Sequence, residues 1–187
     1  AYALAVQPDG KLAVAGTCSN GGNSDFCLAR YNNDGSLDTS FNGSGKVVTS
    51  IGNGSDYAVA LAQQPDGKLV ATGGCGNGLS ADFCLARHNT DGSLDNSFNG
   101  SGKVVTSIGN GVADAKTLAL QPDGKLVVAG VCATGSNHDF CLTRYNADGS
   151  LDTAFNGSGV VVTPVGSNGG LAHALALQPD GKLVAAG

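Results

Sequence analysis

Glutamate, methionine and tryptophan are absent from this 187-residue chain, and lysine and arginine together number only 10. All 15 acidic groups are therefore aspartates. A chain without Glu, and with few Lys, Arg or Gln residues, lacks the usual helix formers. Long apolar runs are missing as well, since none approaches the roughly 20 residues that a membrane-spanning helix needs. These absences argue against a helical protein and against a membrane span.

Basic charge is also scarce, and the formal net charge is -5. Such an acidic chain is a poor partner for nucleic acid or for an anionic membrane surface, so we expect neither. The chain starts at Ala1 without Met and carries no signal peptide. We expect that a leader has been removed and that the sequence is a window on a longer chain.

The residues that are abundant belong to turns and strands. Glycine contributes 30 residues, and clusters of Gly, Asn, Asp and Ser alternate with stretches of Val, Leu and Ala. The first group is typical of tight turns and the second of the strands between them. The composition therefore predicts an all-β protein.

One unit of 57 residues is repeated along the chain without insertion or deletion. The sequence Gln-Pro-Asp-Gly-Lys-Leu begins at Gln7, Gln64, Gln121 and Gln178, and residues 40–54 are identical to residues 97–111. Such periodicity indicates tandem structural units. We expect three full repeats and one partial repeat, at residues 1–57, 58–114, 115–171 and 172–187.

Within the first repeat we expect four strands, at about residues 1–7, 11–18, 25–32 and 46–51. The sequences Pro8-Asp9-Gly10 and Asn33-Asp34-Gly35 are signals for tight turns between strands. Four antiparallel strands per repeat, with small or apolar residues on both faces, are typical of stacked propeller blades. The predicted fold is an all-β array of four-stranded antiparallel blades of a β-propeller, with a β-solenoid as the competing fold.

The repeated segments resemble a known family. Residues 7–16 (QPDGKLAVAG), Asp25-Phe26, residues 28–32 (LARYN) and residues 34–38 (DGSLD) are similar to the bacterial delta-60 repeat. That resemblance implies a β-propeller repeat of large secreted or surface proteins, with no established activity and no catalytic residues. The cysteines are not part of the family pattern.

The six cysteines fall in register, two per repeat, with eight residues between the members of each pair. We expect each pair to lie on adjacent antiparallel strands, where directly opposite residues are close enough for a disulfide. The predicted bonds favour an oxidising compartment. Reduced core thiols and a metal site are the alternatives, the latter disfavoured because Cys-x-x-Cys spacing and His partners are missing. The predicted pairs are Cys18–Cys27, Cys75–Cys84 and Cys132–Cys141.

Catalytic residues converge on one site, so useful candidates should interrupt the repeat. His88, His138 and His173 do so, but they fall in unrelated parts of the unit, and we interpret them as substitutions at exposed positions. Most aspartates and the arginines at positions 30, 87 and 144 are in register, which predicts turn caps and a structural ion-pair network. We therefore expect no enzyme activity, no cofactor and no bound metal.

Two weaker motifs remain. The sequence Asn32-x-Asp34-Gly35-x-x-Asp38 has some likeness to a calcium loop, but Arg30 and Phe41 occupy two of its ligand positions, which excludes an EF-hand. An irregular calcium site is left open against a plain Asp-Gly turn. Sequons for N-glycosylation, which arise freely in Asn-Gly-Ser turns, begin at Asn42, Asn53, Asn99 and Asn156.

Three repeats are too few for a closed propeller, which usually has four to eight blades. The near-identity of the repeats favours a structural protein of the cell surface or extracellular space that self-associates, as in a filament. The alternative is a binding module that recognises a glycan or a protein through the loops 19–24, 76–81 and 133–138. These loops contain no aromatic residue, which weakens stacking on sugars.

Overall fold

The computed structural model describes residues 1–77, 80–135, 137–166 and 169–187, and these contain strands and turns but no helix. The fourteen strands form three four-stranded sheets and one two-stranded sheet. Blade 1 contains β1 (Ala3–Val6), β2 (Leu12–Asn20), β3 (Asn23–Tyr31) and β4 (Lys46–Thr49); blade 2 contains β5 (Asp56–Gln63), β6 (Leu69–Asn77), β7 (Ser80–His88) and β8 (Lys103–Thr106); blade 3 contains β9 (Ala113–Leu120), β10 (Leu126–Thr134), β11 (Asn137–Tyr145) and β12 (Val160–Thr163); the half-blade contains β13 (Ala174–Leu177) and β14 (Leu183–Ala186).

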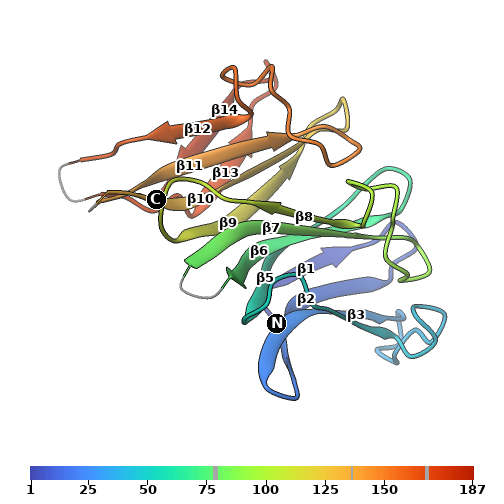
Figure 1. The fold of residues 1–187 in the computed structure, drawn as a ribbon. Helices are drawn as coiled ribbons and strands as arrows, with labels where there is room; N and C mark the ends of the chain where they lie inside the picture. The colour runs from blue at the N-terminus through green and yellow to red at the C-terminus, as the bar shows by residue number, and fades with distance from the viewer. Residues whose placement is uncertain (78–79, 136, 167–168) are drawn as a thin grey trace.

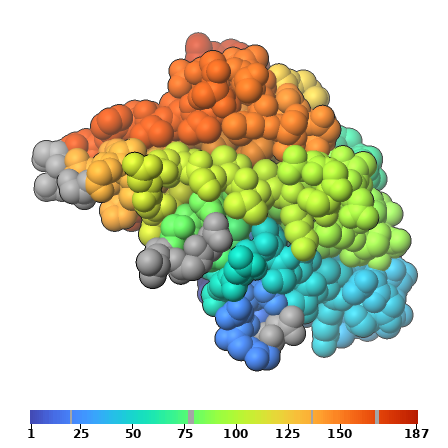
Figure 2. Space-filling model, viewed as in Figure 1, coloured from blue at the N-terminus to red at the C-terminus, as the bar shows by residue number. Residues whose placement is uncertain are grey.

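Each four-stranded sheet is an antiparallel meander in sequence order, as the repeat predicts. The sheets follow one another face to face, from blade 1 through blade 2 to blade 3 (Figure 1), and the space-filling view shows the same succession of layers (Figure 2). The first strands of the blades contact one another in series, β1 with β5, β5 with β9 and β9 with β13. They are therefore the inner strands, while β4, β8 and β12 form the outer edges. The sheets do not close into a ring, and the predicted fold class is confirmed.

The turn between the first two strands of each blade follows directly from its sequence. Gly10 has φ = 84°, a value that residues with a side chain rarely adopt. Its amide donates to the Gln7 carbonyl at 2.9 Å, and the Gln7 amide donates to the Lys11 carbonyl at 2.8 Å. The turn at Asp34 is closed by the Asp34 carboxylate, which accepts from the Ser36 amide at 2.9 Å and from its hydroxyl at 2.6 Å. Both predicted turns are confirmed.

The hairpin between β2 and β3 extends further than predicted. Ser19 pairs with Ser24 and Asn20 pairs with Asn23, so the strands continue through most of the segment 19–24 that the sequence had assigned to a loop. The same pairing occurs between Gly76 and Ala81 and between Ala133 and His138. The described residues of the expected recognition loops at 19–24, 76–81 and 133–138 are thus mostly strand. The reason is that strand pairing uses backbone hydrogen bonds, which polar residues at a hairpin tip can form as well as apolar ones.

The hydrophobic core lies between successive blades. Phe26, Leu28 and Phe41 of blade 1, with exposures of 0–2%, belong to one buried cluster with the apolar face of blade 2. The equivalent side chains of blade 2, Phe83 and Leu85 among them, pack in the same way against blade 3. Apolar residues on both faces of blade 2 and on the facing sides of blades 1 and 3 are thereby removed from water, which is the main stabilising term of such a stack.

Candidate functional site: blade interfaces and a cavity beside blade 3

An arginine in the third strand of each blade organises a buried ion-pair cluster. Arg30 Nε donates to Asp38 Oδ2 at 2.7 Å, and Lys11 Nζ lies 3.0 Å from the same oxygen. The guanidinium lies over the Phe41 ring, 4.6 Å from its centroid, in a cation–π contact. The clusters around Arg87 and Arg144 repeat this geometry, and the predicted pairing of the arginines with one set of aspartates is therefore present.

These contacts account for one repeated set of aspartates, Asp38, Asp95 and Asp152. The hydrogen bond from Ser40, together with those from Lys11 and Arg30, holds the pKa of Asp38 well below its ordinary value despite burial. Asp34 is occupied by its turn, so both carboxylates of the calcium-like motif have protein partners. No group of three or more His, Cys or Asp side chains in the described residues is placed to hold a metal ion.

The same arginines also join neighbouring blades. Arg30 Nη1 donates to the Thr90 carbonyl at 2.6 Å, and Arg87 Nη1 donates to the Ala147 carbonyl at 2.6 Å, each acceptor lying 60 residues further along the chain. Beside this bond the Asn42 amide donates to the Asp91 carbonyl at 2.6 Å. Hydrogen bonds to charged donors are the stronger ones, so the arginine couples the ion-pair cluster of one blade to the turn of the next.

A third interblade bond connects the outer strand of one blade to the end of the third strand of the next. The Tyr145 hydroxyl donates to Thr106 Oγ1 at 2.7 Å. In the preceding interface His88 takes the place of the tyrosine, and its Nε2 lies 3.0 Å from Thr49 Oγ1. The equivalent residue of blade 1 is Tyr31.

His88 is not at an exposed position, and the sequence-based interpretation of it was wrong. Its side chain is 0% exposed at the interface between blades 1 and 2. Burial lowers the pKa of His88 from 6.5 to about 4, so the ring is neutral near pH 7. The tyrosine at the same position in the other two repeats could have indicated that His88 is buried, because a repeated aromatic residue usually packs in an interface.

The six cysteines form the three predicted pairs, with Cα–Cα distances of 5.7, 5.8 and 5.8 Å. Their register differs from the expectation. Cys18 is directly opposite Asp25, and Cys27 is opposite Gly16, so the bonded residues are diagonal neighbours on β2 and β3. The reason is the turn at Gly21-Gly22, which pairs Asn20 with Asn23 and so places Cys18 opposite Asp25. Cys75–Cys84 and Cys132–Cys141 are buried within the interfaces with the preceding blades.

Blade 1 has an open face of the kind that blades 2 and 3 bury. Val14, Cys27, Ala29 and Tyr31 line a cavity of about 430 Å³ on this face. All eight equivalent residues in blades 2 and 3 are 0% exposed against the preceding blade. They are Ala71, Cys84, Ala86, His88, Val128, Cys141, Thr143 and Tyr145.

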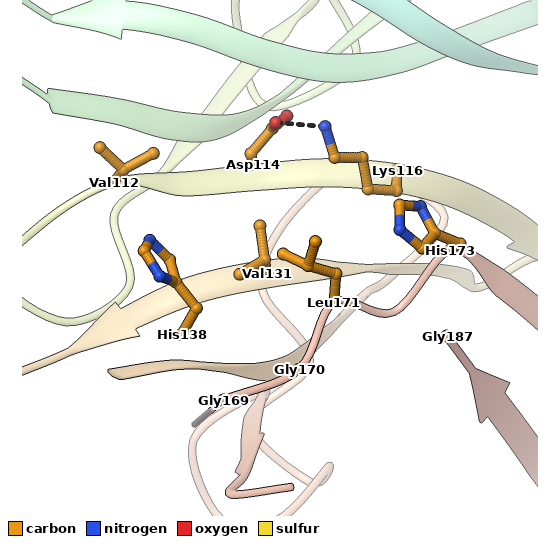
Figure 3. Close-up of a pocket in the computed structure, with 10 residues that line it drawn as sticks. All are labelled: Val112, Asp114, Lys116, Val131, His138, Gly169, Gly170, Leu171, His173 and Gly187. Carbon is orange, nitrogen blue, oxygen red and sulfur yellow. Dashed lines mark hydrogen bonds and ion pairs between the residues drawn. The ribbon is translucent and has the colours of Figure 1, made fainter. Parts of the chain in front are cut away.

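The other two histidines, both exposed as predicted, lie closer together in space than the sequence suggested. His138, in β11, and His173, just before β13, line one cavity of about 700 Å³ beside blade 3. Asp114 and Lys116 of β9 line the same cavity and form an ion pair (Figure 3). This convergence cannot be predicted from an alignment of the repeats. The alignment shows which positions are equivalent, but it does not show which segments of different repeats lie next to each other in space.

Four-stranded blades that stack through repeated hydrogen bonds and buried disulfides define a repeat protein of the β-propeller class. A family model described as "Domain of unknown function (DUF5122) beta-propeller" matches residues 7–41, 64–98 and 121–155, more than half of the chain. The chain belongs to this family. The match supports the expected β-propeller repeat family, whereas the delta-60 repeat remains a resemblance.

A comparison with curated proteins finds no match. Among solved structures, the chain is similar to an X-ray structure of a candidate gluconolactonase, with 15% identity and a TM-score of 0.44. The match covers 97% of this chain and 53% of that structure, so the chain spans about half its length. A likeness this distant carries no information on activity. The described residues contain no helix that is long and apolar enough to cross a membrane.

Proposed function

We propose that this chain is a non-catalytic repeat protein of an extracellular or cell-surface assembly, in which the blades act as stacking units. The observation that carries the proposal is the open face of blade 1. Its residues occupy positions that are fully buried by a neighbouring blade in both internal interfaces. A surface with this composition and shape therefore fits another blade of the same kind, and the proposed partners are further blades, either in another copy of the chain or in further repeats of the same chain.

The inner strand of blade 1 strengthens this argument. Tyr2, Leu4 and Val6 are 69%, 58% and 66% exposed on β1. Leu61, which is the equivalent of Leu4 in blade 2, packs against the core cluster shared with blade 1. Contiguous exposed apolar side chains of this kind mark interaction surfaces.

Two further observations support the remaining parts of the proposal. Three disulfides favour a location outside the reducing cytoplasm. The ion-pair aspartates bind arginine and lysine of their own blade, as in the network of Asp38, Asp95 and Asp152. Repeated carboxylates that are paired in this way stabilise each blade, and they are not free to act as catalytic groups.

Negative-stain electron microscopy of the non-reduced 187-residue chain tests the proposal, with sedimentation velocity to measure the size of particles in solution. We expect regular assemblies for the unmodified chain. Leu4→Asp places a charge on the open face and should reduce assembly strongly. Val105→Asp is the matched control, because Val105 is 48% exposed on β8, away from that face. Monomers in all three samples, or equal assembly of both variants, would contradict the proposal.

A further inference from the structure

The cavity beside blade 3 is lined by strand residues on one side and by the segment 169–173 on the other (Figure 3). We propose that it binds a small neutral saccharide. The cavity volume of about 700 Å³ lies within the range of roughly 300–1,000 Å³ that is usual for small-molecule sites. This inference goes beyond the proposed assembly, because the open face of blade 1 lies on another blade.

The cavity coincides with changes in the repeat. Tyr57 of blade 2 is replaced by Asp114 in blade 3, and Val59 is replaced by Lys116. In blade 2 the Tyr57 ring lies across Gly74, so closely that a Cβ on Gly74 would be 2.5 Å from the tyrosine hydroxyl. In blade 3 the tyrosine–glycine pair is replaced by the smaller Asp114 opposite the larger Val131, the equivalent of Gly74, and both line the cavity.

The polar groups of the cavity come from different repeats and elements. Asp114 and Lys116 are partners in an ion pair, and their side chains are 14% and 28% exposed. His138 and His173 lie at opposite ends of the labelled group, with Val131 and Leu171 between them (Figure 3). Each of the four polar side chains interrupts the repeat, as residues selected for one site should.

The charges in the cavity select the class of ligand. The lysine and the aspartate neutralise each other, so the cavity offers no unbalanced charge to a strongly ionic ligand. The carboxylate can accept hydrogen bonds from hydroxyl groups, the ammonium group can donate to them, and an imidazole can do both. Alternating donors and acceptors match the hydroxyl groups of a neutral sugar.

The apolar lining supports the same class and sets the expected strength. Val112, Val131 and Leu171 provide aliphatic surface against which the C–H face of a sugar ring can pack. The described residues that line the cavity include no Phe, Tyr or Trp ring on which the sugar could stack. We therefore expect dissociation constants in the millimolar range.

Histidine NMR provides a direct test, because the chain contains only three histidines. The imidazole signals would be assigned with single His→Gln variants and followed during titration with cellobiose, lactose and N,N′-diacetylchitobiose. Sodium acetate and ethylamine serve as charged probes. His88, buried at another interface, is the internal reference. Saturable shifts of both His138 and His173 with at least one saccharide, but not with the charged probes, are the expected result.

Asp114→Tyr combined with Val131→Gly restores the tyrosine–glycine pair of the preceding repeat, so the ring should fill the cavity without a clash and without disturbing the blade. We expect this variant to retain its strand signals and thermal unfolding while losing the saccharide-dependent shifts. Val105→Asp, with its substitution on the outer edge of blade 2, should bind like the unmodified chain. No shift with any of the three saccharides, tighter binding of a charged probe, or unchanged binding by the double variant Asp114→Tyr, Val131→Gly would overturn the proposal. The titrations would be made in the Leu4→Asp background, because assembly of the unmodified chain would broaden the imidazole signals, so the result does not depend on whether the chain assembles.

Discussion

The Tyr145 hydroxyl and Thr106 Oγ1, 2.7 Å apart, join the third strand of blade 3 to the outer strand of blade 2. At the preceding interface His88 and Thr49 make the corresponding contact at 3.0 Å. The two interfaces share their arginine bonds. They differ in this contact and in the bond from Lys103 Nζ of blade 2 to the Ser50 carbonyl at 2.7 Å, because Val160 takes the place of Lys103 in blade 3. In addition, His88 Nδ1 is buried without a hydrogen-bond partner among the described residues. At this contact, the interface between blades 1 and 2 should therefore be less stable than the interface between blades 2 and 3.

Replacing His88 with tyrosine should stabilise the chain by about 1–2 kcal/mol, because it removes an unsatisfied buried nitrogen and restores the tyrosine–threonine bond. Urea denaturation at pH 7, followed by circular dichroism, measures the difference. The reciprocal substitution Tyr145→His should destabilise the chain by a similar amount. If both variants change stability in the same direction, the histidine and the tyrosine do not make corresponding contacts at the two interfaces.

The buried histidine also predicts a pH dependence. Its pKa is about 4 in the folded chain and 6.5 when unperturbed, so the unfolded chain binds more protons between these values. Stability should then fall as the pH is lowered from 6.5 to 4, by up to about 3 kcal/mol. Denaturation curves at several pH values would show this slope. In His88→Tyr the slope should be largely absent, since the lowered pKa of Asp38 acts only below about pH 4.

Arg87 and Arg144 provide a matched pair for the interblade arginine bond. Both pair with an aspartate of their own blade at 2.7 Å, but Arg87 also donates to the Ala147 carbonyl of the next blade. Arg87→Ala should therefore destabilise the chain by about 1–3 kcal/mol more than Arg144→Ala, the usual contribution of a charged hydrogen bond. Chemical denaturation of the two variants measures the difference. Equal losses would mean that the interblade bond contributes nothing.

Two glycines test how closely the blades approach. Gly35 and Gly149 occupy the same turn with φ = 83° and 87°, so alanine strains the backbone equally at both. At Gly149 a Cβ would also lie 2.8 Å from the buried ring of Phe98 in the preceding blade, whereas at Gly35 it meets nothing within 4 Å. Gly149→Ala should cost about 1–3 kcal/mol more than Gly35→Ala, the usual effect of overpacking. Thermal unfolding of the two variants gives the comparison.

The disulfides should contribute unequally to stability. Removal of the Cys18–Cys27 bond by double substitution to alanine should cost about 2–3 kcal/mol, the chain-entropy value for so short a loop. Cys75 and Cys84 are 1% and 0% exposed, so the same change there also leaves a cavity between blades and should cost more. Denaturation without reductant measures both losses. A smaller loss at the buried pair would contradict its place in the interface.

Much of the fold could be predicted because the same pattern of strands and turns occurs in three successive repeats. The turns at Gly10 and Asp34 were specified by local chemistry, and the cysteine spacing indicated the correct pairs. The diagonal register of Cys18 and Cys27 was not predictable, since it depends on which two residues between the strands form the turn. Several Gly, Asn and Ser residues in the segment 19–24 are suited to a turn, so the sequence does not specify the two that form it.

The candidate sites were harder to predict than the strands. Burial of His88 depends on contact with the preceding blade, and sequence register alone does not specify which face of a sheet is covered. The cavity of Asp114, Lys116, His138 and His173 joins residues from two repeats and from a segment between strands. Only three-dimensional stacking brings these residues together, so each looked isolated in the sequence.

The outer strands have a consequence for the direction in which such blades can combine. Strands β4 and β8 are four residues long, begin with Lys46 and Lys103, and pair along one side only. A short edge with a positive charge is a poor template for another strand, whereas the broad apolar face of a blade has no such protection. Growth is therefore disfavoured sideways and favoured along the stacking direction, which would produce slender assemblies instead of sheets.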